Sequence, residues 1–245
     1  MKTSSLWYLS ADMAYYKIAG LVVEMESFGR TVKQAESYRC TAQTADIIIK
    51  SDWQALQKSQ PHLSDEDCEY LCTGGSFYRQ LLNFDGMMLH ASAVVLDGKA
   101  YLFSAPCGTG KSTHTALWKQ VFGNRAVILN DDKPALRLEN GTWYAYGTPW
   151  SGKYDMSINM KAPVAGICFL HQARQNTIEP LNGPKAIFAL LEQTARPPEA
   201  AARAKLMDLL DRLISLVPLW QMGCNISPEA ALLSSKNMTQ YKNPV

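Results

Sequence analysis

Short apolar runs rich in Val and Ile recur through the first 60 positions of the chain. Residues 18–25 and 45–50 each have the length and the β-branched content of a strand. A polar stretch around residues 29–37 separates these two runs. The pattern therefore predicts that the chain opens mostly with strands.

The polarity changes after Ser64, where three acidic residues follow one another. Asp65-Glu66-Asp67 is typical of the first turn of a helix, with Ser64 as its cap and Asp67 at the capping-box position. A second short helix is expected over residues 76–83, before the turn at Asp85-Gly86. We therefore predict a β-rich supporting domain over residues 1–84.

Strand-like and helical runs alternate in the rest of the chain. Asp97-Gly98 and Glu139-Asn140-Gly141 each separate two apolar runs and are typical of β-hairpin turns. The expected strands cover residues 88–96, 99–104, 126–130, 135–138, 142–146, 164–170 and 219–222, and the expected helices cover residues 111–122, 184–194, 198–216 and 228–236. This alternation, with its hairpins, predicts an α/β domain with a mixed sheet over residues 85–245.

A glycine-rich stretch, Ala105-Pro106-Cys107-Gly108-Thr109-Gly110-Lys111-Ser112-Thr113, lies between an expected strand and an expected helix. Free amides at a helix start attract anions, and glycines let a loop curl so that several amides converge. We expect residues 107–113 (Cys107, Gly108, Thr109, Gly110, Lys111, Ser112 and Thr113) to bind the phosphates of a nucleotide. Lys111 would supply charge for the β- and γ-phosphates, and Ser112 would ligate Mg²⁺. The usual Walker A pattern, or P-loop, begins with Gly, where this chain has Ala105.

Two adjacent carboxylates, Asp131 and Asp132, follow the apolar run that ends at Asn130. In a nucleotide site this position lets one aspartate complete the Mg²⁺ shell while the other accepts a proton from a hydroxyl. We assign Asp132 as the Mg²⁺ ligand and Asp131 as the proton acceptor, although the two roles could be exchanged. Both carboxylates are usable only if the strand ends or bulges there, because neighbours on a strand face opposite ways.

His90, Lys153 and His114 are further candidates of lower specificity. His90 precedes an expected strand and could lie beside the transferred phosphoryl group, or could simply be packed among apolar neighbours. Gly147-Thr148-Pro149-Trp150-Ser151-Gly152-Lys153 repeats the glycine spacing, but Tyr154 replaces the needed Ser or Thr and no helical pattern follows. We interpret it as a rigid loop whose Lys153 could touch the substrate or the γ-phosphate, or be solvated. His114 is expected to be exposed.

Composition and charge narrow the function classes. The 245 residues carry a net charge of +2 without a long basic run, so bulk electrostatics does not favour a nucleic-acid partner. No apolar run approaches the ~20 residues of a membrane span, and Met1-Lys2-Thr3-Ser4-Ser5-Leu6-Trp7 lacks the apolar core of a signal peptide. Six dispersed cysteines are typical of reduced thiols, so we expect a cytoplasmic protein. The oligomeric state stays open, a homo-oligomer included.

Three segments together resemble the HPr kinase/phosphorylase family, in particular its small relatives that lack the classical N-terminal domain: 89–93 (Leu-His-Ala-Ser-Ala), 105–113, and 129–132 (Leu-Asn-Asp-Asp). The loop also resembles that of ATP-dependent phosphoenolpyruvate carboxykinase. The resemblance implies a P-loop-containing, mixed-sheet α/β core with flanking helices. It also implies ATP and Mg²⁺ as cofactors, His90 near the phosphate, and one of the paired aspartates as base.

The sequence thus predicts an ATP- and Mg²⁺-dependent kinase that transfers the γ-phosphate to a serine-type hydroxyl of a peptide or small molecule. Asp131, His90, Lys111 and Lys153 are its expected catalytic residues, and Ser112 and Asp132 its expected metal ligands. A nucleotide-switched regulatory protein with slow ATPase activity is the alternative, and a carboxykinase acting on a small acid is a third. The acceptor and the choice between ATP and GTP stay open.

Overall fold

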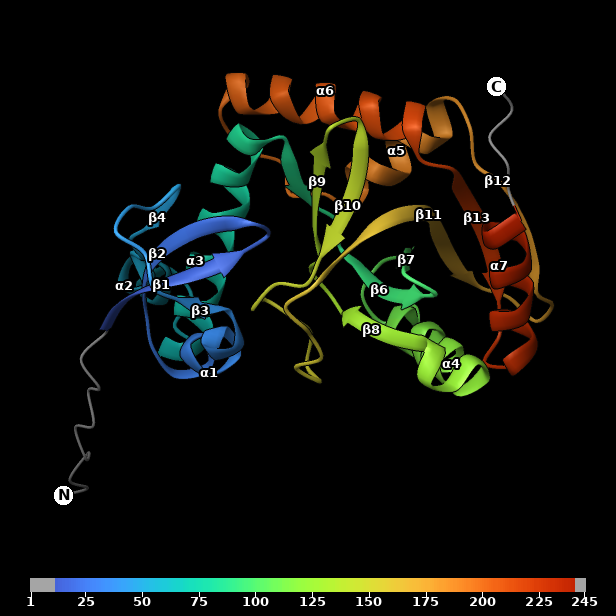
Figure 1. Ribbon diagram of the computed structural model, residues 1–245, viewed down its shortest axis with the longest axis horizontal. Helices are drawn as coiled ribbons and strands as arrows, with labels where there is room; N and C mark the ends of the chain where they lie inside the picture. The colour runs from blue at the N-terminus through green and yellow to red at the C-terminus, as the bar shows by residue number, and fades with distance from the viewer. Residues whose placement is uncertain (1–11, 241–245) are drawn as a thin grey trace. The chain divides into compact units, whose positions relative to one another are not determined.

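The computed structural model describes residues 12–240 as a mixed α/β protein, so the expectation for residues 1–7 lies outside the described residues. The described residues divide into two compact units, residues 12–77 and 78–240. Seven α-helices and thirteen strands are assigned within residues 12–240 (Figure 1). No helix in that range is long and apolar enough to cross a membrane.

The first unit is built on a four-stranded sheet of order β3-β1-β2-β4. Its strands are β1 (Asp12–Ile18), β2 (Leu21–Ser27), β3 (Arg39–Cys40) and β4 (Ile47–Ile49). Its helices are α1 (Gly29–Ala35), α2 (Trp53–Ser59) and α3 (Asp65–Leu81), the last of which contains the boundary between the units. The predicted cap of α3 is confirmed, because Ser64 Oγ accepts a 3.1 Å hydrogen bond from the Asp67 amide.

Two predictions for this region are wrong, and the helix α1 was left unpredicted. Residues 18–25 are not one strand, because Ala19-Gly20 forms a turn with positive φ at both positions, so β1 and β2 pair as a hairpin. The polar stretch around residues 29–37 contains the helix α1. Residues 76–83 do not form a separate helix, because α3 continues without interruption from Asp65 to Leu81.

The second unit contains one nine-stranded mixed sheet of order β5-β9-β10-β11-β7-β6-β8, with β13 beside β11 and β12 beside β13. Its strands are β5 (Gly86–Met88), β6 (Ala91–Leu96), β7 (Lys99–Ser104), β8 (Ala126–Asn130), β9 (Ala135–Glu139), β10 (Thr142–Tyr146), β11 (Lys161–Gln172), β12 (Thr177–Pro180) and β13 (Leu219–Cys224). The mixed sheet and both predicted hairpin turns are confirmed. The expected strand over 88–96 is interrupted at Leu89 and His90, which separate β5 from β6.

Helices cover both faces of this sheet. They are α4 (Lys111–Phe122), α5 (Pro184–Glu192), α6 (Ala200–Leu216) and α7 (Pro228–Gln240). Alternating residues of β6 and β7 divide between the faces, with Ala93 and Leu102 packed against α5 and α6, and Val94 and Phe103 packed against α4 and α7. The predicted apolar stripe of α6 is confirmed, since all four of its residues are buried: Leu206, Leu210, Leu213 and Val217.

One edge of the sheet gathers the candidate residues. Strands β7, β11 and β13 are parallel, and β8 runs in the same direction as β7 because both are antiparallel to β6. Their carboxyl ends therefore lie at the same edge, where ligands bind in open α/β sheets. Along this edge the glycine-rich loop follows β7, with β6 and β8 on one side of it and β11 and β13 on the other.

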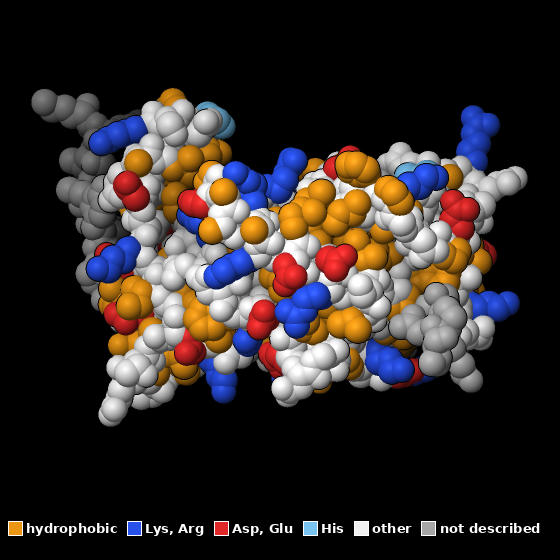
Figure 2. All heavy atoms as spheres, turned by 90° about the horizontal axis from the view of Figure 1, so that it is seen from above, with side chains coloured by type: hydrophobic (Ala, Val, Ile, Leu, Met, Phe, Trp, Pro, Cys, Tyr) orange, Lys and Arg blue, Asp and Glu red, His pale blue; other side chains and the backbone are white. Residues whose placement is uncertain are grey.

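Charged side chains of both signs lie among apolar ones on the face that Figure 2 shows. All six cysteines are free thiols: Cys40, Cys68, Cys72, Cys107, Cys168 and Cys224.

Candidate functional site

The glycine-rich loop joins β7 to α4, as its sequence predicts. Gly108 and Gly110 adopt φ angles of +79° and +117°, in the left-handed region that favours glycine. The Thr109 amide donates a 3.3 Å hydrogen bond to Pro106 O, which closes the turn before α4 begins at Lys111. The amides of the first helical turn therefore face the loop without helix partners, at the positive end of the helix dipole.

Lys111 is held over this loop rather than extended into solvent. Its Nζ donates a 3.0 Å hydrogen bond to Ala105 O, and the residue is 7% exposed. Burial lowers the pKa of the Lys111 ammonium, while the negative charge of Asp132 opposes that shift. A cation in such surroundings is a ready partner for an anion that enters the loop.

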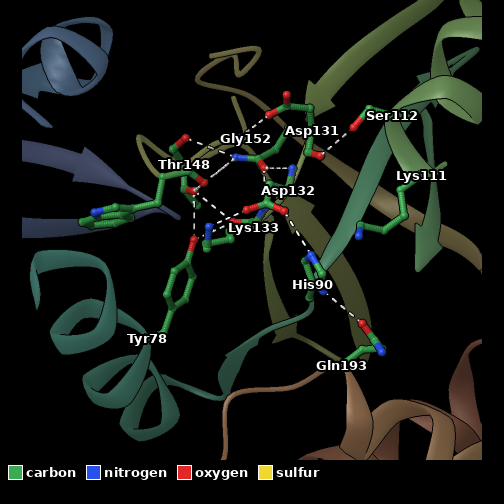
Figure 3. A network of polar contacts seen from close by, with 12 residues as sticks. Tyr78, His90, Lys111, Ser112, Asp131, Asp132, Lys133, Thr148, Gly152 and Gln193 are labelled. Carbon is green, nitrogen blue, oxygen red and sulfur yellow. Dashed lines mark hydrogen bonds and ion pairs between the residues drawn. The ribbon is translucent and has the colours of Figure 1, made fainter. Parts of the chain in front are cut away.

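Asn130 organises the end of β8. Its Oδ1 accepts hydrogen bonds from the amides of Asp132 (2.9 Å) and Lys133 (2.7 Å), and its Nδ2 donates to the carbonyl oxygens of Thr148 and Trp150, both at 3.2 Å. The strand ends here, and the two carboxylates that follow point to different groups (Figure 3). The expected end of the strand before the two aspartates is confirmed.

Asp132 is the carboxylate that shares its surroundings with Lys111. Its Oδ1 lies 3.1 Å from His90 Nε2, and its Oδ2 contacts Lys133 Nζ. Burial would raise the pKa of the Asp132 carboxyl, but the hydrogen bond from His90 and the charge of Lys133 outweigh it and hold that pKa well below its usual range. With 21% of its side chain exposed, Asp132 is an ionised carboxylate that solvent can reach.

Asp131 points away from His90, toward Gly152 (Figure 3). Its Oδ1 accepts a 2.5 Å hydrogen bond from the Gly152 amide, and its Oδ2 is buried without a hydrogen-bond partner within residues 12–240. Burial raises the pKa of the Asp131 carboxyl, and the Gly152 hydrogen bond opposes the shift. Because Asp131 is only 2% exposed, it is far less accessible than its neighbour.

His90 is fixed at three points. Its amide donates a 2.8 Å hydrogen bond to Gln193 O, its carbonyl accepts a 2.8 Å hydrogen bond from Ser104 Oγ, and its Nδ1 lies 3.0 Å from Gln193 Oε1. With Nε2 against the Asp132 carboxylate, the imidazole lies between two oxygen atoms. This arrangement holds an N–H donor beside Asp132.

The donor set at this edge fits a cation that is held mainly by a ligand's own oxygens. Within residues 12–240 there is no group of three or more His, Cys, Asp or Glu side chains that could hold a metal ion. The Ser112 hydroxyl donates a 3.4 Å hydrogen bond to Asp131 O, and the Oδ2 of the same aspartate is buried without a partner among residues 12–240. One hydroxyl and one or two carboxylates, completed by phosphate oxygens and water, are what Mg²⁺ commonly uses.

The other predicted site residues lie in more exposed positions. Cys107, Gly108 and Thr113 are exposed on the loop and the first turn of α4, and Thr109 and Gly110 are half-buried. Lys153 is exposed, and its Nζ lies 4.8 Å from the centre of the Tyr154 ring. The expectation for His114 is wrong: it is 2% exposed, because it packs against Phe103 and bonds Ser234 Oγ through Nε2 at 3.0 Å.

The sequence reasoning missed the residues that support the site. Gln193 holds His90 from the end of α5, and nothing in the local sequence marks it. Tyr78 donates a hydrogen bond to Lys133 O and lies 2.9 Å from Thr148 Oγ1, which fixes the turn after Asp132. Of these supporting residues, only Asn130 could have been recognised from the sequence, because a polar residue at the end of a buried strand needs hydrogen-bond partners.

Comparisons with known proteins identify the family of this chain. No curated protein matches the chain. Among solved structures, the Hpr(Ser) kinase/phosphatase from Coxiella burnetii is distantly similar, with 15% sequence identity and a TM-score of 0.35 over 62% of this chain and 94% of that one. The family model for SynChlorMet cassette protein ScmC matches residues 65–225, which is well over half of the chain. The chain therefore belongs to the ScmC family of SynChlorMet cassette proteins.

Proposed function

We propose that the second unit is an ATP- and Mg²⁺-dependent phosphotransferase that moves the γ-phosphoryl group to a serine-type hydroxyl of a peptide or small molecule. One observation carries the proposal: Lys111, His90 and Asp132 come together at the sheet edge where the glycine-rich loop joins β7 to α4 (Figure 3). Phosphoryl transfer depends on such positioning and charge rather than on covalent chemistry by the protein.

The loop and the first turn of α4 would bind the triphosphate. The amides of residues 107–113 supply hydrogen-bond donors, and the positive φ of Gly108 and Gly110 lets the backbone curl around the phosphates. Lys111 would exchange its bond to Ala105 O for the β- and γ-phosphates, which are much stronger acceptors than a carbonyl. Pro106 has no N–H to donate, so the amides that bind phosphate would begin one residue later than in the usual pattern.

The two aspartates have opposite surroundings, and these favour exchanging the roles that the sequence assigns to them. Asp132 is the more exposed carboxylate, and His90 and Lys133 fix its two oxygens. We assign Asp132 as the group that accepts the proton of the attacking hydroxyl. Asp131 keeps a buried, unpartnered carboxylate oxygen, and its carbonyl bonds the Ser112 hydroxyl; these two residues would hold Mg²⁺. When bound, Mg²⁺ would neutralise charge on the phosphate oxygens.

The proposed transfer balances without a further reactant. The acceptor hydroxyl oxygen forms a bond to the γ-phosphorus, the bond from that phosphorus to the bridging oxygen breaks, and ADP leaves with the electron pair. The hydroxyl proton passes to Asp132. Lys111 would place positive charge where the transferring group gains negative charge, and His90, held between Gln193 and Asp132, would fix the Asp132 carboxylate beside it.

The proposal is tested by incubating the protein with γ-labelled ATP, Mg²⁺ and serine-containing acceptors. The acceptors would be a panel of peptides and small alcohols, and Asp132→Asn would serve as the control. A kinase transfers the label to an acceptor, and we expect the control to lose transfer by at least about a hundredfold. Label that appears only as free phosphate would instead indicate a nucleotide-switched regulatory protein. Turnover that requires oxaloacetate would indicate a carboxykinase.

A further inference from the structure

A pocket of about 460 Å³ opens on the side of the glycine-rich loop that faces away from the aspartates. Its lining residues come from the loop, from one side of α4, and from the segments that follow β11 and β13. Gly108 and Gly110 form its border with the loop, and the apolar walls are Leu117, Ala173 and Ile226. Its volume and apolar lining are typical of sites for small organic ligands.

The position of the pocket complements that of the aspartates. Along the sheet edge, β6 and β8 bring His90 and Asp132 to one side of the loop, while β11 and β13 bring the pocket to the other. A molecule whose phosphates lie in the loop would therefore have its reacting end near Asp132. Its opposite end would lie in the pocket.

Two residues that line the pocket each carry a buried polar atom without a hydrogen-bond partner among residues 12–240. His114 lines the pocket and is 2% exposed, and its Nδ1 has no hydrogen-bond partner within residues 12–240. Asn225 also lines the pocket, and its buried Oδ1 is without a partner in the same described range. Because Asn225 Nδ2 donates a 3.0 Å hydrogen bond to Arg174 O, the free atom of this amide is the acceptor.

Buried polar atoms in folded proteins are nearly always bonded, so each of these two atoms indicates a missing partner. The Asn225 oxygen needs an N–H or O–H donor. Burial lowers the pKa of His114 to about 4, so the ring is neutral near pH 7 and can offer one bare nitrogen or one N–H at Nδ1. Apolar walls with a few polar atoms of this kind fit a flat heteroaromatic ring with donors and acceptors along its edge.

We propose that this pocket binds the base of the nucleotide, with Asn225 Oδ1 accepting an N–H of the base and His114 Nδ1 contacting its edge. The inference rests on the proposed function and adds the part of the site that distinguishes a nucleotide from its bare phosphate chain. Ile226, which is 81% exposed at the rim, would become covered by the base.

The test compares ATP and GTP with inorganic tripolyphosphate, each with Mg²⁺, by titration calorimetry. Tripolyphosphate carries the phosphate chain without a base. For the unchanged protein we expect at least one of the two nucleotides to bind about tenfold more tightly than tripolyphosphate, since contacts worth about 1.4 kcal/mol have that effect.

Ala173→Trp places a large ring in the pocket. We expect it to reduce nucleotide affinity to the level of tripolyphosphate while the affinity for tripolyphosphate changes less than twofold. Leu232→Trp, at a half-exposed position of α7 that does not line the pocket, is the matched control and should leave both affinities unchanged. If Ala173→Trp does not fold, Ile226→Ala serves instead, with an expected loss of about threefold for nucleotides only.

The outcomes separate the two proposals. Equal affinity for nucleotides and tripolyphosphate, or a preference for nucleotides that survives Ala173→Trp, would overturn the base pocket but leave the phosphate site intact. An equal loss of affinity for nucleotides and for tripolyphosphate in Ala173→Trp would also overturn the base pocket. Absence of binding by every one of these ligands would instead refute the phosphotransferase itself.

Discussion

Two loops of the second unit share a glycine spacing but differ in everything that surrounds it. Residues 105–111 follow β7 and lead into α4, and residues 147–153 follow β10 and lead into no helix. Lys111 is 7% exposed and bonds its own loop, whereas Lys153 is exposed and lies over Tyr154. A lysine after a glycine-rich stretch thus acquires different surroundings depending on the element that follows.

The glycines of the two loops are also needed for different reasons. Gly108 and Gly110 have positive φ angles, and a Cβ at either would meet nothing within 4 Å. A Cβ at Gly147 would lie 1.9 Å from Ile158 O, and one at Gly152 would lie 2.9 Å from Asp131 Oδ2. The first loop therefore needs glycine for backbone conformation beside open space, and the second needs it for close packing.

Each loop is associated with one of the two adjacent aspartates. Asp132 shares its surroundings with Lys111 of the first loop, and Asp131 bonds the Gly152 amide of the second. The first pairing leaves the Asp132 carboxylate open to solvent, while the second bonds Asp131 Oδ1 to a loop and leaves its Oδ2 buried and unpartnered. The glycine spacing alone therefore does not identify a phosphate-binding loop. The spacing indicates one only where a helix begins after the loop and open space lies beside it.

The largest expected effect separates the two lysines. Lys111→Ala should reduce phosphoryl transfer by about a hundred- to a thousandfold, because it removes a charge aimed at the transferring phosphates. Lys153→Ala is the matched change in the second loop and should cost less than about tenfold, because an exposed lysine is screened by solvent. Rates with saturating ATP and acceptor would measure both, and equal losses would contradict the distinction between the loops.

The next effect concerns stability. Gly147→Ala should lower the free energy of unfolding by about 3 kcal/mol or more, because its Cβ would collide with a backbone oxygen that cannot move away. Gly108→Ala should cost only about 1 kcal/mol, since its penalty is the positive φ alone. Urea unfolding of the two variants gives these values. A milder effect for Gly147→Ala than for Gly108→Ala would show that packing in the second loop is not the constraint.

A smaller effect tests how His90 is positioned beside the first loop. Gln193→Leu removes the acceptor at His90 Nδ1 and should reduce kcat by about tenfold, with a shift in the pH profile. Gln193→Glu keeps an oxygen acceptor and should restore most of the rate. If both variants lost activity equally without a pH shift, Gln193 would only support the fold.

The smallest effect is the pH dependence of stability, where the two aspartates have opposite signs. The folded-state pKa of Asp132 is depressed, so its contribution is present above the unfolded value of about 3.9 and is lost as the pH falls through the folded value. The pKa of Asp131 is raised, so its ionisation destabilises the fold as the pH rises above about 4.

Unfolding free energies between pH 2.5 and pH 7 would measure these signs. Asp132→Asn should flatten the acid loss of stability and lower stability near pH 7. Asp131→Asn should remove the opposing slope, because its side-chain oxygen can still accept the Gly152 amide without a buried charge. The same sign in both variants would contradict the opposite environments of the two carboxylates.

Elements with strong local signals were predictable from the sequence. The Asp97-Gly98 turn, the cap at Ser64 and the apolar stripe of α6 are confirmed, because each depends on residues within one or two turns of the chain. The hairpin turn at Ala19-Gly20 was missed because Gly20 is its only local signal and Ala is unusual at positive φ. The burial of His114 was missed because it depends on Ser234, 120 residues further along.

The sequence by itself determined that a glycine-rich loop would stand between a strand and a helix, and that two carboxylates would follow a buried strand. Backbone conformation, helix starts and strand ends depend on residues that are close in the chain, so the local sequence determines these features. Only the tertiary structure decided which aspartate meets His90, that Gln193 holds that histidine, and that a pocket lies on the other side of the loop. These arrangements depend on the order of strands in the sheet, which brings together residues that the chain separates by up to about a hundred positions.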